Sequence, residues 1–262
     1  MTCLFTRRKL RGISGIEINK MLNTYTQSFQ ISSFDLNPNA SARLTSLANY
    51  LQEMAYQHGK RLNLGFHDLK KENHAWVLSR LHLKMHHLPG WDDVITIETW
   101  PRSVDRLFVL RDFKITNEKG EVIGNATSYW LIIDMNTHRI TRITKDIMEL
   151  ETREDSVFDA KSEKLEMFPE LSEAYKKTVA FADLDIVGHV NNVKYMEWCM
   201  DAIPLETHLN HELVELEINF LHEAKYGEEI QLNCSGSDQM FMVNAVNIET
   251  GKECVRSRIR FR

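Results

Sequence analysis

The sequence predicts an α+β protein in which two antiparallel sheets each wrap around a central helix. A pattern of one strand, one helix and several further strands occurs twice along the 262 residues. The second of the two helices is apolar on nearly all sides, so most of its surface must be buried. A sheet that curls around such a helix buries it economically, and this arrangement is the hotdog shape. The prediction is therefore a tandem double hotdog.

The first repeat is predicted over residues 21–143. A strand over Thr24–Ser32 precedes a helix with an apolar stripe at helical spacing. The stripe consists of Leu44, Leu47, Ala48, Leu51, Met54 and Ala55. The next strand alternates, with Val77, Leu81, Leu83 and Met85 on one face and Arg80, His82, Lys84 and His86 on the other. Further strands are predicted at Ile95–Trp100, Leu107–Ile115 and Val122–Ile133.

The second repeat is predicted over residues 172–262. Residues 144–171 before it are charge-rich and weakly periodic, which is typical of a linker with one helix. Its strands are predicted at Lys177–Phe181, Val214–Phe220, Glu229–Cys234, Met240–Ile248 and Glu253–Phe261, with a helix at Val190–Ile203 that ends at Pro204. In the last strand, Arg256, Arg258, Arg260 and Arg262 alternate with apolar residues. This arginine stripe predicts a basic, solvated face, or a surface for an acidic carrier protein.

Composition narrows the class of protein. The net charge of -5 argues against nucleic-acid binding. The four cysteines are widely spaced without a CxxC pair, which argues against disulfides or a zinc ribbon and fits a cytoplasmic location. No apolar run approaches the roughly 18 residues of a membrane span. Residues 1–20 are basic, as in a transit peptide, but they contain few apolar residues. We therefore expect a disordered leader before a natural start at Met21.

The segment from Phe181 to Tyr195 carries the residues suited to chemistry. Asp185 precedes a turn, Gly188 lies in it, and His189 begins the predicted helix. The first N–H groups of a helix lack internal partners and can hold a carbonyl oxygen that becomes negative during attack. A carboxylate and an imidazole at this spacing can activate water or attack directly. Equally, Asp185 can simply cap the helix.

The stretch Asp183–Tyr195 resembles the D-L-D-x-x-x-H-V-N-N-x-K-Y signature of acyl-acyl carrier protein (acyl-ACP) thioesterases from plants and bacteria. A shorter form of the signature recurs in other hotdog thioesterases. Weaker similarity extends over Leu47, Asn49, Gln52 and Glu53 of the first helix, Trp76, and Trp100–Arg102. The resemblance implies that Asp185 and His189 are catalytic. It also implies that Glu223 is a second carboxylate, a candidate base for water.

Two positions depart from the family pattern. Ala224 stands where the plant enzymes have cysteine, so a cysteine nucleophile cannot apply there. Val187 stands where the family has an asparagine that orients substrate or water. Strict alternation from Val214 places Glu223 on the solvent face of its strand, and only a bulge near Leu221–His222 re-aims it toward the site.

The resemblance implies hydrolysis of acyl-ACP, which releases free fatty acid in fatty acid biosynthesis. Val187, Gly188 and Asn191 are then expected near the thioester, and Leu47, Leu51 and Met54 along the acyl chain. The first repeat has no equivalent of Gly188–His189 in its loop Asp35–Ala42, so we expect it to bind the chain without catalysis. No metal or organic cofactor is implied, and His82 and His86 are expected at the surface. The partner is acyl carrier protein, and the protein is a monomer or a homodimer.

Three alternatives remain open from the sequence. An acyl-CoA thioesterase would share the fold and the chemistry. A non-catalytic acyl-binding protein is compatible with Val187 and Ala224. A dehydratase-like lyase would leave the thioester intact and release no thiol.

Overall fold

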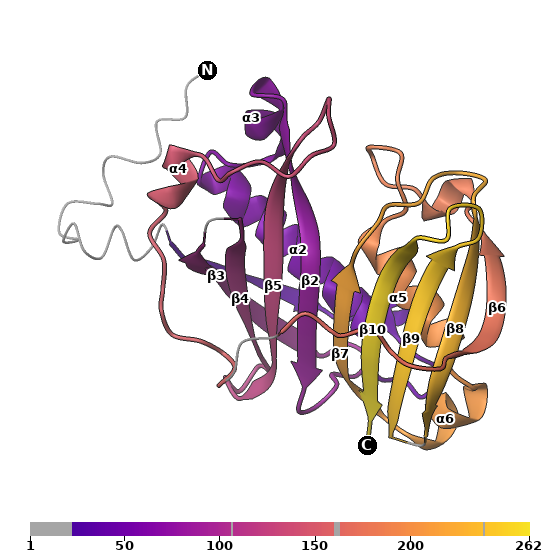
Figure 1. Cartoon of the computed structure of the whole chain (residues 1–262). Coiled ribbons are helices and arrows are strands. Elements are labelled where there is room, and N and C mark those ends of the chain that lie inside the picture. The colour runs from indigo at the N-terminus through magenta and orange to yellow at the C-terminus, as the bar shows by residue number, and fades with distance from the viewer. Residues whose placement is uncertain (1–22, 106, 160–162, 238) are drawn as a thin grey trace.

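The computed structural model describes residues 23–105, 107–159, 163–237 and 239–262. The leader predicted at residues 1–20 lies outside these ranges. Within them, ten strands form one antiparallel sheet, and two central helices pack on the same side of it (Figure 1). No helix in these ranges combines the length and apolar character that crossing a membrane requires.

The two halves repeat one order of elements. The first half contains β1 (Tyr25–Gln30), α2 (Leu44–Arg61), α3 (Phe66–Lys71), β2 (His74–Met85), β3 (Val94–Val104), β4 (Val109–Thr116) and β5 (Val122–Asp134). The second half contains β6 (Ser172–Thr178), α5 (Asn192–Asp201), α6 (Leu205–Asn210), β7 (Leu213–Phe220), β8 (Glu229–Ser237), β9 (Met240–Asn247) and β10 (Glu253–Phe261). The predicted double hotdog is confirmed. The sequence pattern missed α3 and α6, and it placed the entry strand of the second half at Lys177–Phe181, whereas β6 spans Ser172–Thr178 and Phe181 begins a short 3-10 helix.

The strand order reads the same from both edges of the sheet. From one edge it is β1-β3-β4-β5-β2, and from the other β6-β8-β9-β10-β7. The halves meet where β2 pairs antiparallel with β7, from Arg80 opposite Asn219 to Lys84 opposite Glu215. The two predicted sheets are thus one continuous sheet with a pseudo-twofold axis at the β2–β7 seam.

The central helices fill the concave side of each half, behind the sheet in Figure 1. The apolar stripe of α2 is at most 2% exposed from Leu44 to Met54 and belongs to the main core. Helix α5 begins two residues later than predicted, because the side chain of Asn191 accepts the N–H of Val193 at 2.8 Å and caps the helix there. Pro204 separates α5 from α6.

The linker lies across the opposite face of the sheet. After the short helix α4 (Lys145–Met148), the N–H of Val157 donates to the carboxylate of Asp112 on β4, and that of Leu165 donates to the side chain of Asn219 on β7. The ring of Phe158 stacks on His82 at 4.2 Å. The linker therefore shields polar side chains on this outer face along its path from β4 to β7.

The arginine stripe lies on this outer face, where Arg260 and Arg262 are exposed as predicted, but the prediction of a solvated position is wrong for Arg256. Arg256 is 7% exposed and donates to the carbonyl of Leu165 in the linker. Each arginine is paired with a carboxylate: Arg256 with Glu253, Arg258 with Glu217, Arg260 with Glu215 and Arg262 with Glu212. The stripe is therefore largely neutralised.

A β-bulge between Leu78 and Arg80 shifts the pairing of β2 with β5. Because of this shift, Val77 shares the face of Arg80 rather than that of Leu81, contrary to the predicted alternation.

Candidate active site

The structure brings His189 and Glu223 together from separate loops. The Nδ1 atom of His189 lies 3.3 Å from Oε2 of Glu223. Their backbones are held side by side, because the N–H of Val190 donates to the carbonyl of Ala224 at 3.0 Å and His189 forms a β-bridge with Lys225. A carboxylate at this position orients an imidazole and stabilises its protonated form.

Glu223 faces His189 because the backbone is irregular at Leu221–His222, between the end of β7 and Glu223. After β7, the N–H groups of Leu221 and His222 both donate to the carbonyl of Cys254, at 2.8 and 3.2 Å. Two successive donors to one acceptor are the hydrogen bonding of a bulge, which exchanges the faces of the following residues. The structure thus has at Leu221–His222 the hydrogen bonding that a catalytic role for Glu223 requires.

Asp185 organises the loop before the helix. Its Oδ1 accepts the N–H groups of Val187 at 2.9 Å and His189 at 3.2 Å. Gly188, with φ +85°, donates its N–H to the carbonyl of Asp185 at 3.1 Å. The prediction that His189 begins the helix, with its first N–H groups next to Gly188, is therefore wrong, since α5 begins at Asn192 and the N–H of Gly188 is bonded within the loop.

The loop of the first half has the same backbone but different chemistry. Asn37 stands in the place of Asp185, Ser41 in that of His189, and Ala40 adopts φ +61° in the place of Gly188. The N–H of Asn37 donates to the carbonyl of Ser41, as that of Asp185 does to His189, both at 2.8 Å. The carboxylate and the imidazole thus occur in one of two matching loops.

A cavity of about 470 Å³ adjoins the loop of Asp185 and His189, which we call the catalytic loop for the role predicted from the sequence. Ile186 and Asn191 line it from the loop, on either side of His189 in sequence. Helix α2 lines it with residues that include Asn49, Gln52, Ala55, Tyr56 and Gly59, and its far wall includes Leu64, Trp76, Val109 and Trp130. The predicted acyl contacts Leu47, Leu51 and Met54 do not line this cavity; they lie on the core face of α2. Val187 is half-exposed at the tip of the loop.

Arg111 places a buried positive charge in the cavity wall, which the sequence did not predict. Its Nη1 donates to Nδ1 of His58 at 2.9 Å and to Oγ1 of Thr99 at 3.2 Å. Desolvation by burial lowers the pKa of Arg111 to about 10. The side chain is therefore turned into the protein and cannot contact a carrier protein.

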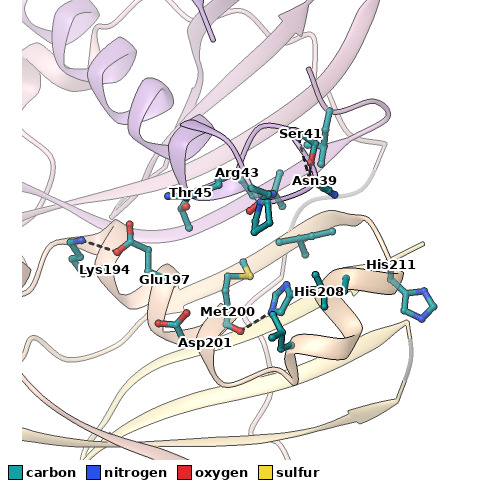
Figure 2. Close-up of a pocket in the computed structure, with 17 residues that line it drawn as sticks. Asn39, Ser41, Arg43, Thr45, Lys194, Glu197, Met200, Asp201, His208 and His211 are labelled. Atoms are coloured by element: carbon teal, nitrogen blue, oxygen red, sulfur yellow. Dashed lines mark hydrogen bonds and ion pairs between the residues drawn. The ribbon is translucent and has the colours of Figure 1, made fainter. Parts of the chain in front are cut away.

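The pseudo-twofold axis relates this cavity to a second one of about 500 Å³. Figure 2 shows that Asn39 and Ser41 of the first loop face Glu197, Met200 and Asp201 of α5. Each cavity is thus formed by the loop of one half and the helix of the other. Only the cavity beside α2 adjoins an aspartate and a histidine in its loop.

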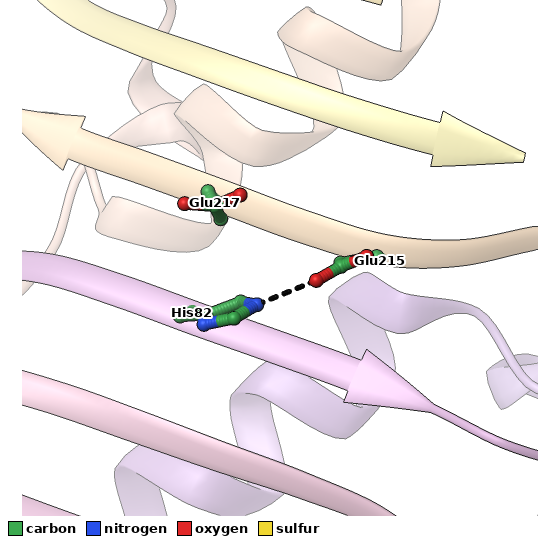
Figure 3. A group of neighbouring side chains, drawn as sticks. All are labelled: His82, Glu215 and Glu217. Atoms are coloured by element: carbon green, nitrogen blue, oxygen red, sulfur yellow. Dashed lines mark hydrogen bonds and ion pairs between the residues drawn. The ribbon is translucent and has the colours of Figure 1, made fainter. Parts of the chain in front are cut away.

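A separate group at the seam joins His82, Glu215 and Glu217, whose potential ligand atoms lie within 4.8 Å of one another (Figure 3). Cations already neutralise these carboxylates: Lys84 and Arg260 contact Glu215, and Arg258 contacts Glu217. His82 is 14% exposed, so its predicted position on a solvent face is wrong. The group is best described as an ion-pair network between the halves.

Comparison with protein families matches the acyl-ACP thioesterase N-terminal domain over residues 22–150 and the acyl-ACP thioesterase C-terminal domain over residues 169–262. The chain belongs to the acyl-ACP thioesterase family. The matches include α2 and its cavity in the first domain and the Asp185–His189 loop and Glu223 in the second.

Plant acyl-ACP thioesterases are among the similar proteins. The chloroplastic palmitoyl-ACP thioesterase of Gossypium hirsutum is 30% identical over 91% of this chain and 63% of its own length. Oleoyl-ACP thioesterase 2 of Arabidopsis thaliana is 30% identical over 77% of this chain and 60% of its own length. The chain spans about three fifths of the length of these relatives.

Two solved acyl-ACP thioesterases share the fold along nearly the whole chain. The enzyme from Bacteroides thetaiotaomicron superposes with a TM-score of 0.84 and 26% identity, covering 93% of this chain and 99% of its own. The 12:0-ACP thioesterase from Umbellularia californica superposes with a TM-score of 0.81 and 21% identity, covering 91% of this chain and 97% of its own.

Ala224, where the family pattern has cysteine, is fully buried, and its carbonyl joins the loops of His189 and Glu223. Cys254, on the neighbouring strand, has a thiol pKa raised to about 11, chiefly by burial. Because a thiol with this pKa is protonated at neutral pH, Cys254 is a poor substitute for the missing nucleophile.

Proposed function

We propose that this chain hydrolyses the thioester of acyl-ACP and releases a free fatty acid. The observation that carries the proposal is the 3.3 Å contact of His189 with Glu223 beside a cavity of about 470 Å³. Membership of the family supports the choice of an acyl thioester. The carrier-protein substrate is inferred from the plant acyl-ACP thioesterases to which the chain is similar, which are longer than this chain.

In the proposed mechanism, water is the nucleophile. Glu223 holds Nδ1 of His189, so that the other ring nitrogen accepts a proton from water as the water attacks the thioester carbonyl. The imidazolium, stabilised by Glu223, then returns the proton to the departing thiolate. Water supplies the oxygen of the acid, and the products are fatty acid and thiol.

Asp185 acts first as a positioning residue, since its Oδ1 holds the N–H groups of Val187 and His189. Its Oδ2 has no hydrogen bond to another described residue, and we assign it the second proton of the attacking water. A role as nucleophile would instead form a mixed anhydride with the acyl group. A single turnover in H₂¹⁸O distinguishes the two, because an anhydride attacked at the aspartyl carbonyl places ¹⁸O in Asp185.

The cavity beside α2 is proposed to hold the acyl chain. Ala55, Leu64, Trp76, Val109 and Trp130 provide apolar walls, and Ile186 places the cavity next to the catalytic loop. Gly188 and Val187 then act by shaping the loop. Asn191 acts by capping α5, and its position in the cavity wall keeps it available to substrate.

The proposal is tested by thiol release from C8 to C18 acyl-ACPs and the matching acyl-CoAs, with wild type beside Asp185→Asn. We expect release from acyl-ACP that falls at least 100-fold in the variant, within the range of general acid–base effects. No release by the wild type from any substrate contradicts the proposed activity. Preference for acyl-CoA supports the CoA alternative. Activity unaffected by the substitution removes Asp185 from the site.

The location and assembly of the protein remain predictions. The cytoplasmic location rests on cysteine usage, whereas the plant relatives are named as chloroplastic. A monomer or a homodimer is compatible with the proposed mechanism, because both catalytic loops come from one chain.

A further inference from the structure

Three exposed cations lie on two loops that contact the loop of His189. Lys225 forms a β-bridge with His189, and its side chain is exposed. The turn after β5 brings the ring of His138 to 6.3 Å from that of His189, and the exposed Arg139 and Arg142 follow on this segment. The cations therefore come from both halves of the chain, on segments that reach His189 through Lys225 and His138.

No carboxylate in the part of the chain that the structure describes forms an ion pair with any of these three cations. Among the described residues, the side chains of Arg139, Arg142 and Lys225 have no ion pair, whereas the arginine stripe is paired throughout. The nearby Glu228 is turned inward, where its carboxylate accepts from the N–H of Lys225 at 3.0 Å and from Asn247 at 2.9 Å. In a chain of net charge -5, three exposed cations with no ion pair to another described residue therefore lie on segments that reach His189, which itself lies beside the carboxylates of Asp185 and Glu223.

Large apolar side chains are exposed on these two loops and on the loop of His189. Ile186 of the catalytic loop is 88% exposed, Tyr226 next to Lys225 is 68% exposed, and Ile140 next to Arg139 is 54% exposed. Apolar residues interleaved with unpaired cations are typical of a surface that binds an acidic partner. We call these six residues, Arg139, Ile140, Arg142, Ile186, Lys225 and Tyr226, the rim.

We propose that the rim is the docking surface for the acyl carrier protein, with Arg139, Arg142 and Lys225 contacting its acidic surface and the phosphodiester of its pantetheine arm. This inference rests on the proposed function, which requires the arm to bring its thioester to His189 through the rim. Cations pair strongly with phosphate and carboxylate groups, and complementary charge mainly accelerates and orients association. The arginines of the stripe, by contrast, are each already paired with a carboxylate.

The test compares two triple charge reversals in the full chain. The rim variant carries Arg139→Glu, Arg142→Glu and Lys225→Glu. The control carries Lys119→Glu, Lys164→Glu and Lys176→Glu, which change exposed lysines without ion pairs by the same total charge. Each is assayed with acyl-ACP, acyl-CoA and an acyl-N-acetylcysteamine thioester, which has neither protein nor phosphate, and Tm verifies folding.

For the rim variant, kcat/KM for acyl-ACP is expected to fall by about tenfold or more through KM, since rim charges act mainly on encounter. Turnover of the N-acetylcysteamine thioester should stay within about twofold of wild type, as should all activities of the control. Unchanged acyl-ACP kinetics overturn the proposal. An equal loss of kcat/KM for acyl-CoA also overturns it, because the rim would then bind phosphate groups in general. An equal loss for all three substrates overturns it as well, because the substitutions would then act on catalysis.

A binding measurement separates this inference from the proposed function. Fluorescence anisotropy of labelled holo-carrier protein reports docking without turnover. If the wild type binds the carrier and the rim variant binds it at least tenfold more weakly, docking stands even where no thioester is cleaved. Equal binding by wild type and rim variant, or none by the wild type, overturns the docking surface whatever the hydrolysis assays give.

Discussion

Nε2 of His82 on β2 lies 2.8 Å from Oε1 of Glu215 on β7, so the two halves are joined by a side-chain contact as well as by strand pairing. The hydrogen bond from His82 is the largest cause of a lowered pKa at Glu215, and Lys84 and Arg260 lower it further. Because the pKa of Glu215 is lower in the folded protein than its ordinary value of 4.5, its ionised carboxylate stabilises the fold at pH values above 4.5. This stabilisation is lost as the pH falls through the pKa that Glu215 has in the folded protein.

Glu215→Gln is therefore expected to reduce the free energy of unfolding by about 2 kcal/mol at pH 7, as for a hydrogen bond to a charged group. Urea unfolding of wild type and variant should show this difference shrinking below pH 4.5. Glu149→Gln, which removes an exposed ion pair with Lys145, serves as the control and should change stability by less than about 0.5 kcal/mol. A Glu215 effect that is equal at pH 7 and pH 3.5 contradicts the linkage.

Chelation should leave the protein unchanged. The carboxylates beside His82 already hold Lys84, Arg258 and Arg260, so a metal ion would have to displace these cations. We expect excess EDTA to alter neither Tm nor thioesterase activity. A rise in Tm of several degrees on adding Zn²⁺ that is lost in Glu217→Gln would show that the cluster is a metal site after all.

Gly188→Ala should destabilise the fold by about 1 kcal/mol through backbone strain alone, because φ is +85° and no heavy atom lies within 4 Å of the added Cβ. The matching position offers a reciprocal test. Ala40 already has φ +61°, so Ala40→Gly relieves strain and should not destabilise by more than about 0.5 kcal/mol. Equal losses from both substitutions in chemical denaturation would rule out the strain argument.

Glu223→Gln should lower kcat for acyl-ACP by about 10²–10³-fold, because the amide cannot stabilise the imidazolium of His189. Stability should hardly change, since Glu223 is exposed and its pair with His189 is open to solvent. Steady-state kinetics and Tm check both statements. Glu249→Gln, an exposed carboxylate in the β9–β10 turn, is the matched control and should retain full kcat. If Glu223→Gln retains it too, the catalytic pair is refuted.

The two faces of α2 should respond differently to substitution. Leu51→Ala, in the core, is expected to cost about 2–5 kcal/mol of stability without changing chain-length preference. Ala55→Leu, in the cavity wall, should shift activity toward shorter acyl chains at little cost in stability. Activity profiles over C8 to C18 substrates and urea unfolding provide the comparison. A change of preference at Leu51 rather than Ala55 would restore the acyl contacts predicted from the sequence.

Local patterns predicted the elements well because each depends on neighbours in sequence. The stripe from Leu44 to Met54 identified α2, and alternation from Val214 identified both β7 and the need for a bulge before Glu223. The loop around Asp185 was located correctly, although its N–H groups are bonded to Asp185 within the loop rather than free at a helix terminus.

Contacts between residues far apart in the sequence could not be predicted from local patterns. An amphipathic stripe shows which face of α2 enters the core, but it does not show that Ala55 and Tyr56 border a cavity, because Trp76 and Trp130 supply the opposite wall. Likewise, the alternation of β10 predicted that Arg256 faces solvent. The linker covers it instead, and the pattern of apolar and polar residues in a strand does not show that another segment covers its outer face.

The palindromic sheet has a consequence for how this molecule can evolve. In a symmetric homodimer, each mutation appears in both sites at once, so an improvement to one function is tied to its effect on the other. Here Asn37 and Asp185 are encoded separately although they occupy matching places. Likewise, the wall of the cavity beside α2 and the histidine that adjoins it belong to different halves of one gene. Selection can therefore alter which chains fit without touching the catalytic loop.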